Sequence, residues 1–363
     1  MVRLSDILKK KIQTTPSPEE VKSTPFNQAH QAVSKKEQIQ ESSQQPAEMQ
    51  LAKVMREMQP DIERSKALYS GGVQLAKETL GNVREKKPLD AVKIKDLVAH
   101  IIDYLVLGDK ELLNLFYEYS TDNYLYNHMV NVSIMAVYVG LGLGYNKSRL
   151  NELGLAAFLH DIGMIKVENV ALQPRTLSEE EHNQIKEHPL CGAEILSKIK
   201  DIPGSLISVA KEEHERMDGR GYPCGIKGTE ISEYARIIAT IDVYEALTHK
   251  RSYRNKYLPH EAIKEILNNG SSLFDPVILR TLINRVGIYP IGSWVELNTS
   301  EIGKVVTNND EFPLKPIVNL IFDSAGNKPD ETRAVNLAKQ FNLFIKKPLS
   351  DEEVLKKNNR GGE

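Results

Sequence analysis

The sequence has few cysteines, a single tryptophan and no long hydrophobic run. Two of its 363 residues are cysteines, and Cys191 and Cys224 cannot form the disulfide framework of a small secreted protein. Their sequence contexts do not resemble a thiolate metal site. No segment reaches the roughly 20 consecutive apolar residues of a transmembrane helix, and no apolar signal-peptide core follows Met1. We therefore expect a soluble, cytoplasmic protein with reduced thiols and no membrane insertion.

A large excess of charge of either sign is also absent. The chain has 47 basic and 49 acidic residues, which gives a formal net charge of −2. Proteins that bind nucleic acids generally carry a basic stripe or patch. We therefore expect no nucleic-acid polymer as a partner, whereas a local pocket for a smaller anion is compatible with this balance.

The N-terminal part of the chain changes composition near residue 50. Residues 1–50 are rich in Gln, Ser, Pro, Lys and Glu, so we expect them to be mostly disordered. Helical periodicity resumes after Pro60 and predicts a helical N-terminal region over residues 51–95. Gly71-Gly72 is expected to kink or split this helix. The region either forms a dimerising stalk or packs on the main domain.

Residues 96–288 have the pattern of consecutive helices, which predicts a mainly α protein. Ser178 and Glu181 form a capping box at the start of one helix, and Pro189 must kink or end it. Asp275-Pro276 marks a later helix start. Another predicted helix has a mostly apolar face, so we expect His128 on this face to point inward. The face consists of Leu125, His128, Val132, Met135 and Val139.

The pattern changes again beyond residue 288. Apolar residues alternate with polar ones over residues 292–297, 302–306 and 317–322, and turn residues separate these segments. This predicts a small β-rich appendage over residues 289–350. We expect residues 351–363 to form a flexible tail.

Several residues of metal-ligand type lie on or beside the predicted helices. The adjacent pair His160-Asp161 is the most informative, because it follows an apolar helix where two unpaired polar groups would be costly to bury. An imidazole nitrogen and a carboxylate oxygen are good ligands for first-row divalent metals. Each residue alone is more often a satisfied core residue or a helix cap, but together they predict a site larger than one ion. The candidates are His128, His160, Asp161, His188, His214 and Asp242.

Five motifs occur in a fixed order along the chain. They are His160-Asp161-Ile162-Gly163, His188-Pro189 with Gly192, residues 214–223 (HERMDGRGYP), residues 242–248 (DVYEALT) and Arg251-Ser252-Tyr253-Arg254. In this order they resemble the HD-GYP domain, a subgroup of the HD metal-dependent phosphohydrolases, over roughly residues 95–285. The resemblance implies an HD-type helical bundle over residues 96–288, with a helical N-terminal extension and a small C-terminal β appendage.

The resemblance also implies the roles of individual residues. The first metal site would use His128, His160, Asp161 and Asp242, and the second would use Asp161, His188, Glu213 and His214. The two divalent ions would be iron or manganese, which agrees with the mixed nitrogen and oxygen ligands. Arg251 and Arg254 would bind substrate phosphate, and Gly221, Tyr222 and Pro223 would shape the substrate pocket. The residues expected to act in catalysis are His160, Asp161, Asp218 and Tyr222.

Three positions depart from the family pattern. Met164 stands where a lysine is usual, so a positive group near the phosphate is missing. Glu213 replaces the first of two paired histidines but still supplies an oxygen ligand. Tyr124 stands where family members with a third metal carry a glutamate, and a neutral tyrosine is a poor ligand. We therefore expect two metals rather than three.

The resemblance implies that the protein hydrolyses cyclic di-GMP to pGpG in bacterial second-messenger signalling, and it leaves GMP open as a further product. One alternative is an HD phosphohydrolase acting on another nucleotide. Another is a non-catalytic module that binds a cyclic dinucleotide or a partner, which Met164 keeps open. A homodimer through the N-terminal helices and binding to signalling proteins are further expectations. The sequence leaves the metal's identity, the regulatory input and the oligomeric state undetermined.

Overall fold

The computed structural model divides the chain into two units, Met1–Gln59 and Pro60–Glu363. It describes residues 62–109, 111–117, 124–171, 173, 175, 177–249, 257–269, 272–309, 311–329, 332–350 and 353–355, all of which belong to the second unit. The predicted disordered segment, the start of the helical region and most of the predicted tail therefore lie outside the described residues. Among the helices described, none is long and apolar enough to cross a membrane.

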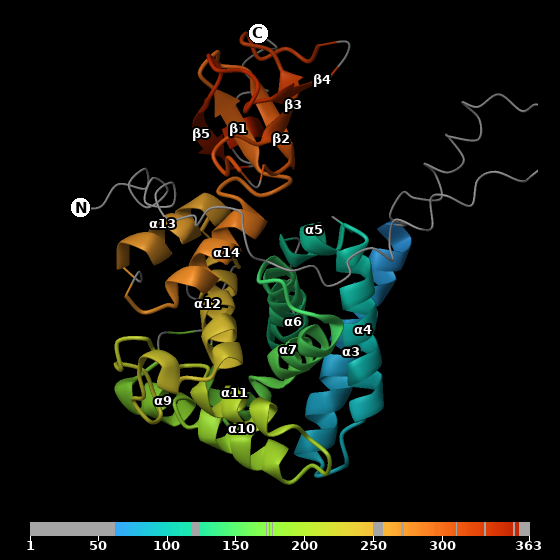
Figure 1. Ribbon diagram of the computed structural model, residues 1–363, viewed down its shortest axis with the longest axis vertical. Helices are drawn as coiled ribbons and strands as arrows, with labels where there is room; N and C mark the ends of the chain where they lie inside the picture. Colours follow the sequence, from blue (N-terminus) through green and yellow to red (C-terminus); the bar gives the residue numbers. More distant parts are fainter. Residues whose placement is uncertain are drawn as a thin grey trace, which may run out of the picture. The chain divides into compact units, whose positions relative to one another are not determined.

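Helices follow one another from residue 62 to residue 286 (Figure 1). Their bounds are α3 Ile62–Arg84, α4 Ala91–Val106, α5 Glu111–Tyr117, α6 Tyr124–Gly142, α7 Lys147–Leu159, η2 Ile162–Lys166, α8 Glu168–Ala171, α9 Glu179–Ile185, α10 His188–Ser197, α11 Gly204–Glu212, η3 Gly228–Glu230, α12 Glu233–Thr248, α13 Pro259–Asn269 and α14 Pro276–Val286.

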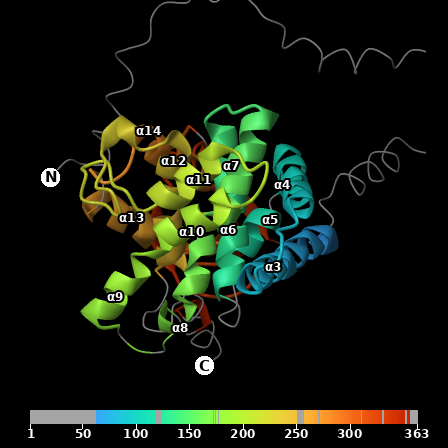
Figure 2. The same ribbon diagram turned by 90° about the horizontal axis from the view of Figure 1, so that it is seen from below.

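Helix α6 lies at the centre of this bundle. It contacts α3, α4, α7 and α12, and Figure 2 shows it among these helices. A helix surrounded by others is apolar on all sides, and α6 is buried along most of its length. Its buried polar residues are therefore conspicuous, because each needs a partner. They are Asn127, His128, Asn131 and Ser133.

Helix α3 packs on the main domain, which was one of the two expected alternatives. Ala76 and Leu80 belong to the same core cluster as α6. Of the kink or split expected at Gly71-Gly72, the split is wrong, because α3 is continuous from Ile62 to Arg84. Gly72 is buried against Leu97 and Val130, so the close packing keeps the helix intact. The boundary predicted between residues 95 and 96 falls inside α4.

The predicted helix boundaries agree with the structure. Ser178 caps α9, and its capping box with Glu181 is complete. Helix α9 ends at Ile185, and Pro189 lies in the first turn of α10, where a missing N–H costs nothing. Asp275 caps α14 by accepting hydrogen bonds from the backbone N–H groups of Val277 and Ile278.

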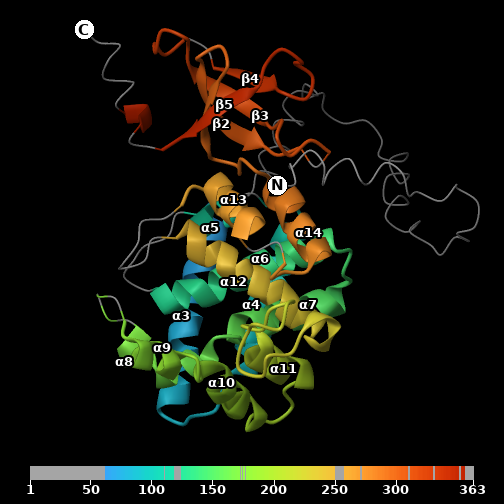
Figure 3. The same cartoon turned by 90° about the vertical axis from the view of Figure 1, so that its left-hand side faces the viewer.

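The C-terminal residues form an antiparallel sheet with strand order β4-β3-β2-β1-β5 (Figure 3). The three segments predicted as strands are confirmed as β1, β2 and β3. The bounds are β1 Trp294–Leu297, β2 Ile302–Thr307, β3 Ile317–Phe322, β4 Arg333–Asn336 and β5 Ile345–Leu349. Residues 353–355, which fall in the predicted flexible tail, form a helical turn, and Val354 packs with Ile302 and Phe322.

Candidate metal centre

The candidate ligands come from segments far apart in the sequence. His128 lies on α6, and His160-Asp161 forms the junction between α7 and η2. His188 begins α10, Glu213-His214 follows α11, and Asp242 lies on α12. The helical bundle brings all of these residues together.

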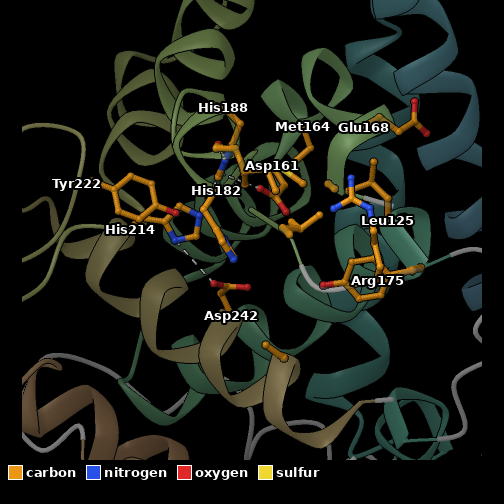
Figure 4. Close-up of a pocket in the computed structure, with 15 residues that line it drawn as sticks. Leu125, Asp161, Met164, Glu168, Arg175, His182, His188, His214, Tyr222 and Asp242 are labelled. Atoms are coloured by element: carbon orange, nitrogen blue, oxygen red, sulfur yellow. Dashed lines mark hydrogen bonds and ion pairs between the residues drawn. The ribbon is translucent and has the colours of Figure 1, made fainter. Parts of the chain in front are cut away.

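The ligands open into a pocket with a cavity volume of about 370 Å³ (Figure 4). Asp161, His188, His214 and Asp242 line one side of this pocket, and Tyr222 lies beside His214. The remaining wall is mixed in character and includes Tyr124, Leu125, Met164, Glu168, Arg175 and His182. The pocket is large enough for a small organic ligand.

One group of ligand atoms gathers around His128. Its Nε2 lies 3.2 Å from Nε2 of His160 and 3.4 Å from Oδ2 of Asp161. Oδ1 of Asp242 lies 3.6 Å from the same nitrogen. The atoms of His128, His160 and Asp161 are close enough together to bind one ion, and Asp242 lies beside them.

A second group gathers around His188. Its Nε2 lies 3.0 Å from Nε2 of His214 and 3.2 Å from both Oδ1 of Asp161 and Oε1 of Glu213. Asp161 therefore directs one carboxylate oxygen to each group. This arrangement suits a carboxylate that bridges two metal ions.

Hydrogen bonds fix the orientation of the histidine rings. Nδ1 of His160 lies 2.7 Å from the carbonyl oxygen of Ala157, and Nδ1 of His188 lies 2.7 Å from that of Ile185. A carbonyl oxygen can only accept, so each Nδ1 donates, and in the neutral ring each Nε2 presents a lone pair. Nδ1 of His128 lies 3.0 Å from Oε2 of Glu245, which sets the same tautomer.

This arrangement fits a bound cation. The Nε2 lone pairs of His128 and His160 face each other at 3.2 Å, and they would repel unless a positive charge lay between them. Glu213 is fully buried, and within the described part of the chain neither of its carboxylate oxygens accepts a hydrogen bond. A buried carboxylate is costly without a compensating charge. A metal at each ligand group would relieve both costs.

The electrostatics of the ligands are strongly coupled. Burial lowers the pKa of His188, but Asp161 and Glu213 outweigh this and raise it to about 11. Burial and the Asp161 charge raise the pKa of Glu213 well above its ordinary value, although His188 opposes this shift. Burial lowers the pKa of His214 to about 3, so its ring is neutral and able to bind a metal. Without metal, the second group therefore retains protons that a cation would displace.

The glycine after the His-Asp pair explains how Asp161 reaches His188. A Cβ atom at Gly163 would lie 2.0 Å from the carbonyl oxygen of His188 and 2.5 Å from the backbone nitrogen of Gly192. Only glycine permits this contact between η2 and the start of α10. The contact brings the two motifs against each other.

Gly221 has a similar role in the Gly-Tyr-Pro loop. A Cβ atom there would lie 2.4 Å from Cα of Glu215, so the loop folds directly back on the segment that follows α11. The backbone N–H of Tyr222 donates to the carbonyl oxygen of His214 at 3.2 Å, and the Tyr222 ring stacks on the His214 ring. Gly221 and Pro223 are not among the residues that line the pocket, whereas Tyr222 is.

Two acidic residues of this loop accept hydrogen bonds from backbone N–H groups. The buried carboxylate of Glu215 accepts hydrogen bonds from the backbone N–H groups of Cys224 and Gly225, at 2.6 Å and 3.0 Å. Asp218, which we expected to act in catalysis, accepts one from the backbone N–H of Arg220 at 3.0 Å. Asp218 is not among the residues that line the pocket.

The three departures from the family pattern have clear positions. Met164 lines the pocket, where its thioether offers no positive charge. Glu213 lies among the ligands of the second group. The Tyr124 ring stacks on the ring of His128, with 5.8 Å between the centroids. Arg251 and Arg254 lie outside the described residues.

Three residues of the site were not predicted from the sequence. Glu245 contacts His128, and Arg175 and His182 line the pocket. A signal for Glu245 was present, because it follows Asp242 by three residues and therefore shares a face of the same helix. No comparable pattern marks Arg175, which lies between α8 and α9, or His182, which lies on α9.

Comparisons with known proteins agree with this geometry. An HD domain model matches residues 116–278, and a model described as a KOW domain associated with an HD domain matches residues 294–357. A cyclic di-GMP phosphodiesterase of Pseudomonas aeruginosa is 30% identical over 284 residues, which cover 78% of this chain and 68% of that protein. Another, PdeB of Borreliella burgdorferi, is 30% identical over 235 residues, which cover 64% and 62% of the two chains.

A solved structure shares the fold. An HDG"Y"P protein of Bdellovibrio bacteriovorus aligns with a TM-score of 0.53 at 19% sequence identity, covering 61% of this chain and 71% of that one. The helical bundle, the ordered motifs and the converging ligands are thus those of one family. This chain belongs to the HD domain family and, within it, to the HD-GYP phosphohydrolases.

Proposed function

We propose that this protein is a two-metal phosphodiesterase that hydrolyses cyclic di-GMP to pGpG, with GMP as a further product to be tested. The observation that carries the proposal is Asp161, whose two carboxylate oxygens face two separate groups of ligand atoms at one end of a pocket. The relatives of this chain from Pseudomonas aeruginosa and Borreliella burgdorferi are both named cyclic di-GMP phosphodiesterases.

The ligand set supports iron or manganese as the metal. Imidazole nitrogens and carboxylate oxygens suit both ions, and within the described residues no thiolate joins the ligand groups. When bound, the two cations would activate water and neutralise negative charge on the phosphoryl oxygens. Two ions are favoured over three, because Tyr124 places an aromatic ring beside His128 where a third ion would need a carboxylate.

The chain's own residues would orient the substrate. Burial raises the pKa of Tyr222 above its ordinary value, so its hydroxyl keeps its proton and can donate a hydrogen bond to phosphate. Its ring also offers a surface on which a base can stack. Arg251 and Arg254, by their position in the family motif, would bind phosphate through their guanidinium groups. Arg254→Ala should therefore raise KM more than it lowers kcat.

The proposal includes the organisation and location of the protein. Residues 96–288 would be the catalytic domain, and residues 51–95 and 289–350 would be its helical and β-rich additions. A cytoplasmic location follows from the proposed substrate, which is an intracellular second messenger.

A second function is favoured by one observation. Met164 leaves the pocket wall without the usual lysine, so the protein could bind a cyclic dinucleotide without cleaving it. The number and burial of the metal ligands argue against this function, because a binding module has no need for them. A different nucleotide substrate is the other alternative.

The test is anaerobic purification with metal analysis, followed by chromatography of products from a panel of cyclic and linear nucleotides. We expect about two iron or manganese ions per chain and conversion of cyclic di-GMP to pGpG. The variants His160→Ala and Asp161→Ala should lose metal and turnover. Tight binding of cyclic di-GMP by metal-loaded protein without any product would show the binding function instead. Preferred cleavage of another nucleotide would replace the substrate.

A further inference from the structure

A buried chain of two hydrogen bonds and one ion-pair contact connects helix α3 to a metal ligand. The Tyr69 hydroxyl donates to Oδ1 of Asn131 at 2.8 Å, and Nδ2 of Asn131 donates to Oε1 of Glu245 at 3.2 Å. Oε2 of Glu245 lies 3.0 Å from Nδ1 of His128. The four residues come from α3, α6 and α12, so the contacts cross the bundle.

The last part of this chain controls how His128 binds a metal. Because the carboxylate of Glu245 lies 3.0 Å from Nδ1, it favours the tautomer with the proton on Nδ1, and Nε2 of His128 is left to face His160 and Asp161. A carboxylate in this position fixes the tautomer and the ring orientation of a metal-binding histidine. Glu245 is fully buried, so it depends on donors that hold it in place.

Asn131 can support Glu245 in only one of its two orientations. Its side chain has a donating and an accepting end of nearly the same shape. A rotated amide would place its oxygen about where Nδ2 now lies, 3.2 Å from Oε1 of Glu245, and two acceptors would face each other. Tyr69 selects the correct orientation, because its hydroxyl donates to the amide oxygen.

We propose that Tyr69 is a positioning residue of the metal centre, which makes α3 part of the site. Through Asn131 and Glu245 it holds His128 in the orientation that binds metal. The inference rests on the proposed metal centre but not on the identity of the substrate. According to this proposal, the N-terminal extension affects metal affinity through Asn131 and Glu245.

A second contact of the same helix supports this role. Arg84, at the end of α3, forms an ion pair with Glu168, which lines the pocket. Tyr69 and Arg84 are fifteen positions apart in one continuous helix, which corresponds to about 22 Å along its axis. Helix α3 thus contacts the site both behind His128 and at the pocket wall.

The test is the substitution Tyr69→Phe, which keeps the ring and removes only the hydroxyl. We expect metal affinity, measured by equilibrium dialysis against Mn²⁺, to fall by about tenfold, at the lower end of the range for supporting residues of metal ligands. Tyr104→Phe is the control, because Tyr104 is also partly buried against the core and lies outside this chain of contacts. It should leave the affinity unchanged.

Additional measurements separate positioning from simple stabilisation. Asn131→Asp, which replaces the donor to Glu245 with an oxygen, should lower affinity more than Tyr69→Phe, and combining Tyr69→Phe with Glu245→Gln should add little to Glu245→Gln alone. If Tyr69→Phe lowers the stability of the metal-free protein but leaves Mn²⁺ affinity unchanged, its role is only structural and the inference is wrong. Because dialysis needs no substrate, a protein that binds metal but does not cleave cyclic di-GMP would contradict the proposed activity without affecting this result.

Discussion

The Nε2 atoms of His128 and His160 lie 3.2 Å apart, and the other ring nitrogen of each histidine already lies against an acceptor. Two imidazole lone pairs held this close together favour the binding of a cation between them. Asp161 connects this group to a second pair of histidines, because its other carboxylate oxygen lies near Nε2 of His188, which contacts His214. The fold therefore brings nitrogen and carboxylate ligands together in two groups that share Asp161.

The bridging position of Asp161 predicts the effect of an isosteric change. Asp161→Asn should reduce bound metal from two ions to at most one and lower kcat by at least ~100-fold, because the amide cannot offer two anionic oxygens. Metal content by mass spectrometry and product formation measure the two effects. Asp218→Asn is the matched control, since Asp218 lies outside the pocket, and it should retain both ions. Equal metal loss in both variants would contradict the bridging role.

Metal affinity should increase with pH. The pKa of His188 is raised to about 11, so in the metal-free protein this histidine is protonated at neutral pH and must lose its proton to bind metal. Rising pH weakens this competition, and affinity should grow by up to ~tenfold per pH unit for each proton displaced. The pKa of His214 is lowered to about 3, so this residue should not contribute to the pH dependence of metal affinity above about pH 5. Titration calorimetry in buffers of different ionisation enthalpy counts the protons released, and release of none would disprove this coupling.

Restoring a positive charge at Met164 should strengthen substrate binding. Its side chain lines the pocket, so the ammonium group of Met164→Lys could reach a substrate phosphate. A charged hydrogen bond contributes about 1.5–3 kcal/mol, so KM should fall by roughly tenfold or more. Met164→Leu controls for the change of shape and should leave KM near its original value. An equal KM in all three proteins would show that phosphate does not approach this wall.

Gly221→Ala should disrupt the pocket loop. The added Cβ would lie 2.4 Å from Cα of Glu215, and overpacking of this kind costs about 1–3 kcal/mol. We expect a lower melting temperature and weaker substrate binding, because the Tyr222 ring would leave His214. The control is Gly71→Ala on the exposed face of α3, where a Cβ meets nothing within 4 Å. That change should stabilise the protein by about 0.5–1 kcal/mol, as expected for alanine within a helix.

Local patterns in the sequence predicted the elements well where one physical signal was dominant. The capping box at Ser178, the Asp275-Pro276 start and the alternation in β1, β2 and β3 depend on neighbouring residues, and all of them are confirmed. Strand β4 gave a weaker pattern, because it has a single buried apolar residue, Val335. The predicted split at Gly71-Gly72 failed because tertiary packing outweighed the low helix propensity of glycine.

The sequence by itself determined the types of ligand, their order and the family they belong to, because each motif is a short run of residues with its own chemistry. Only the tertiary structure decided which oxygen of Asp161 faces which histidine pair, and that Tyr69 connects to His128 through Asn131 and Glu245. Those relationships join residues separated by dozens of positions. They follow from how helices pack around α6, which no local pattern encodes.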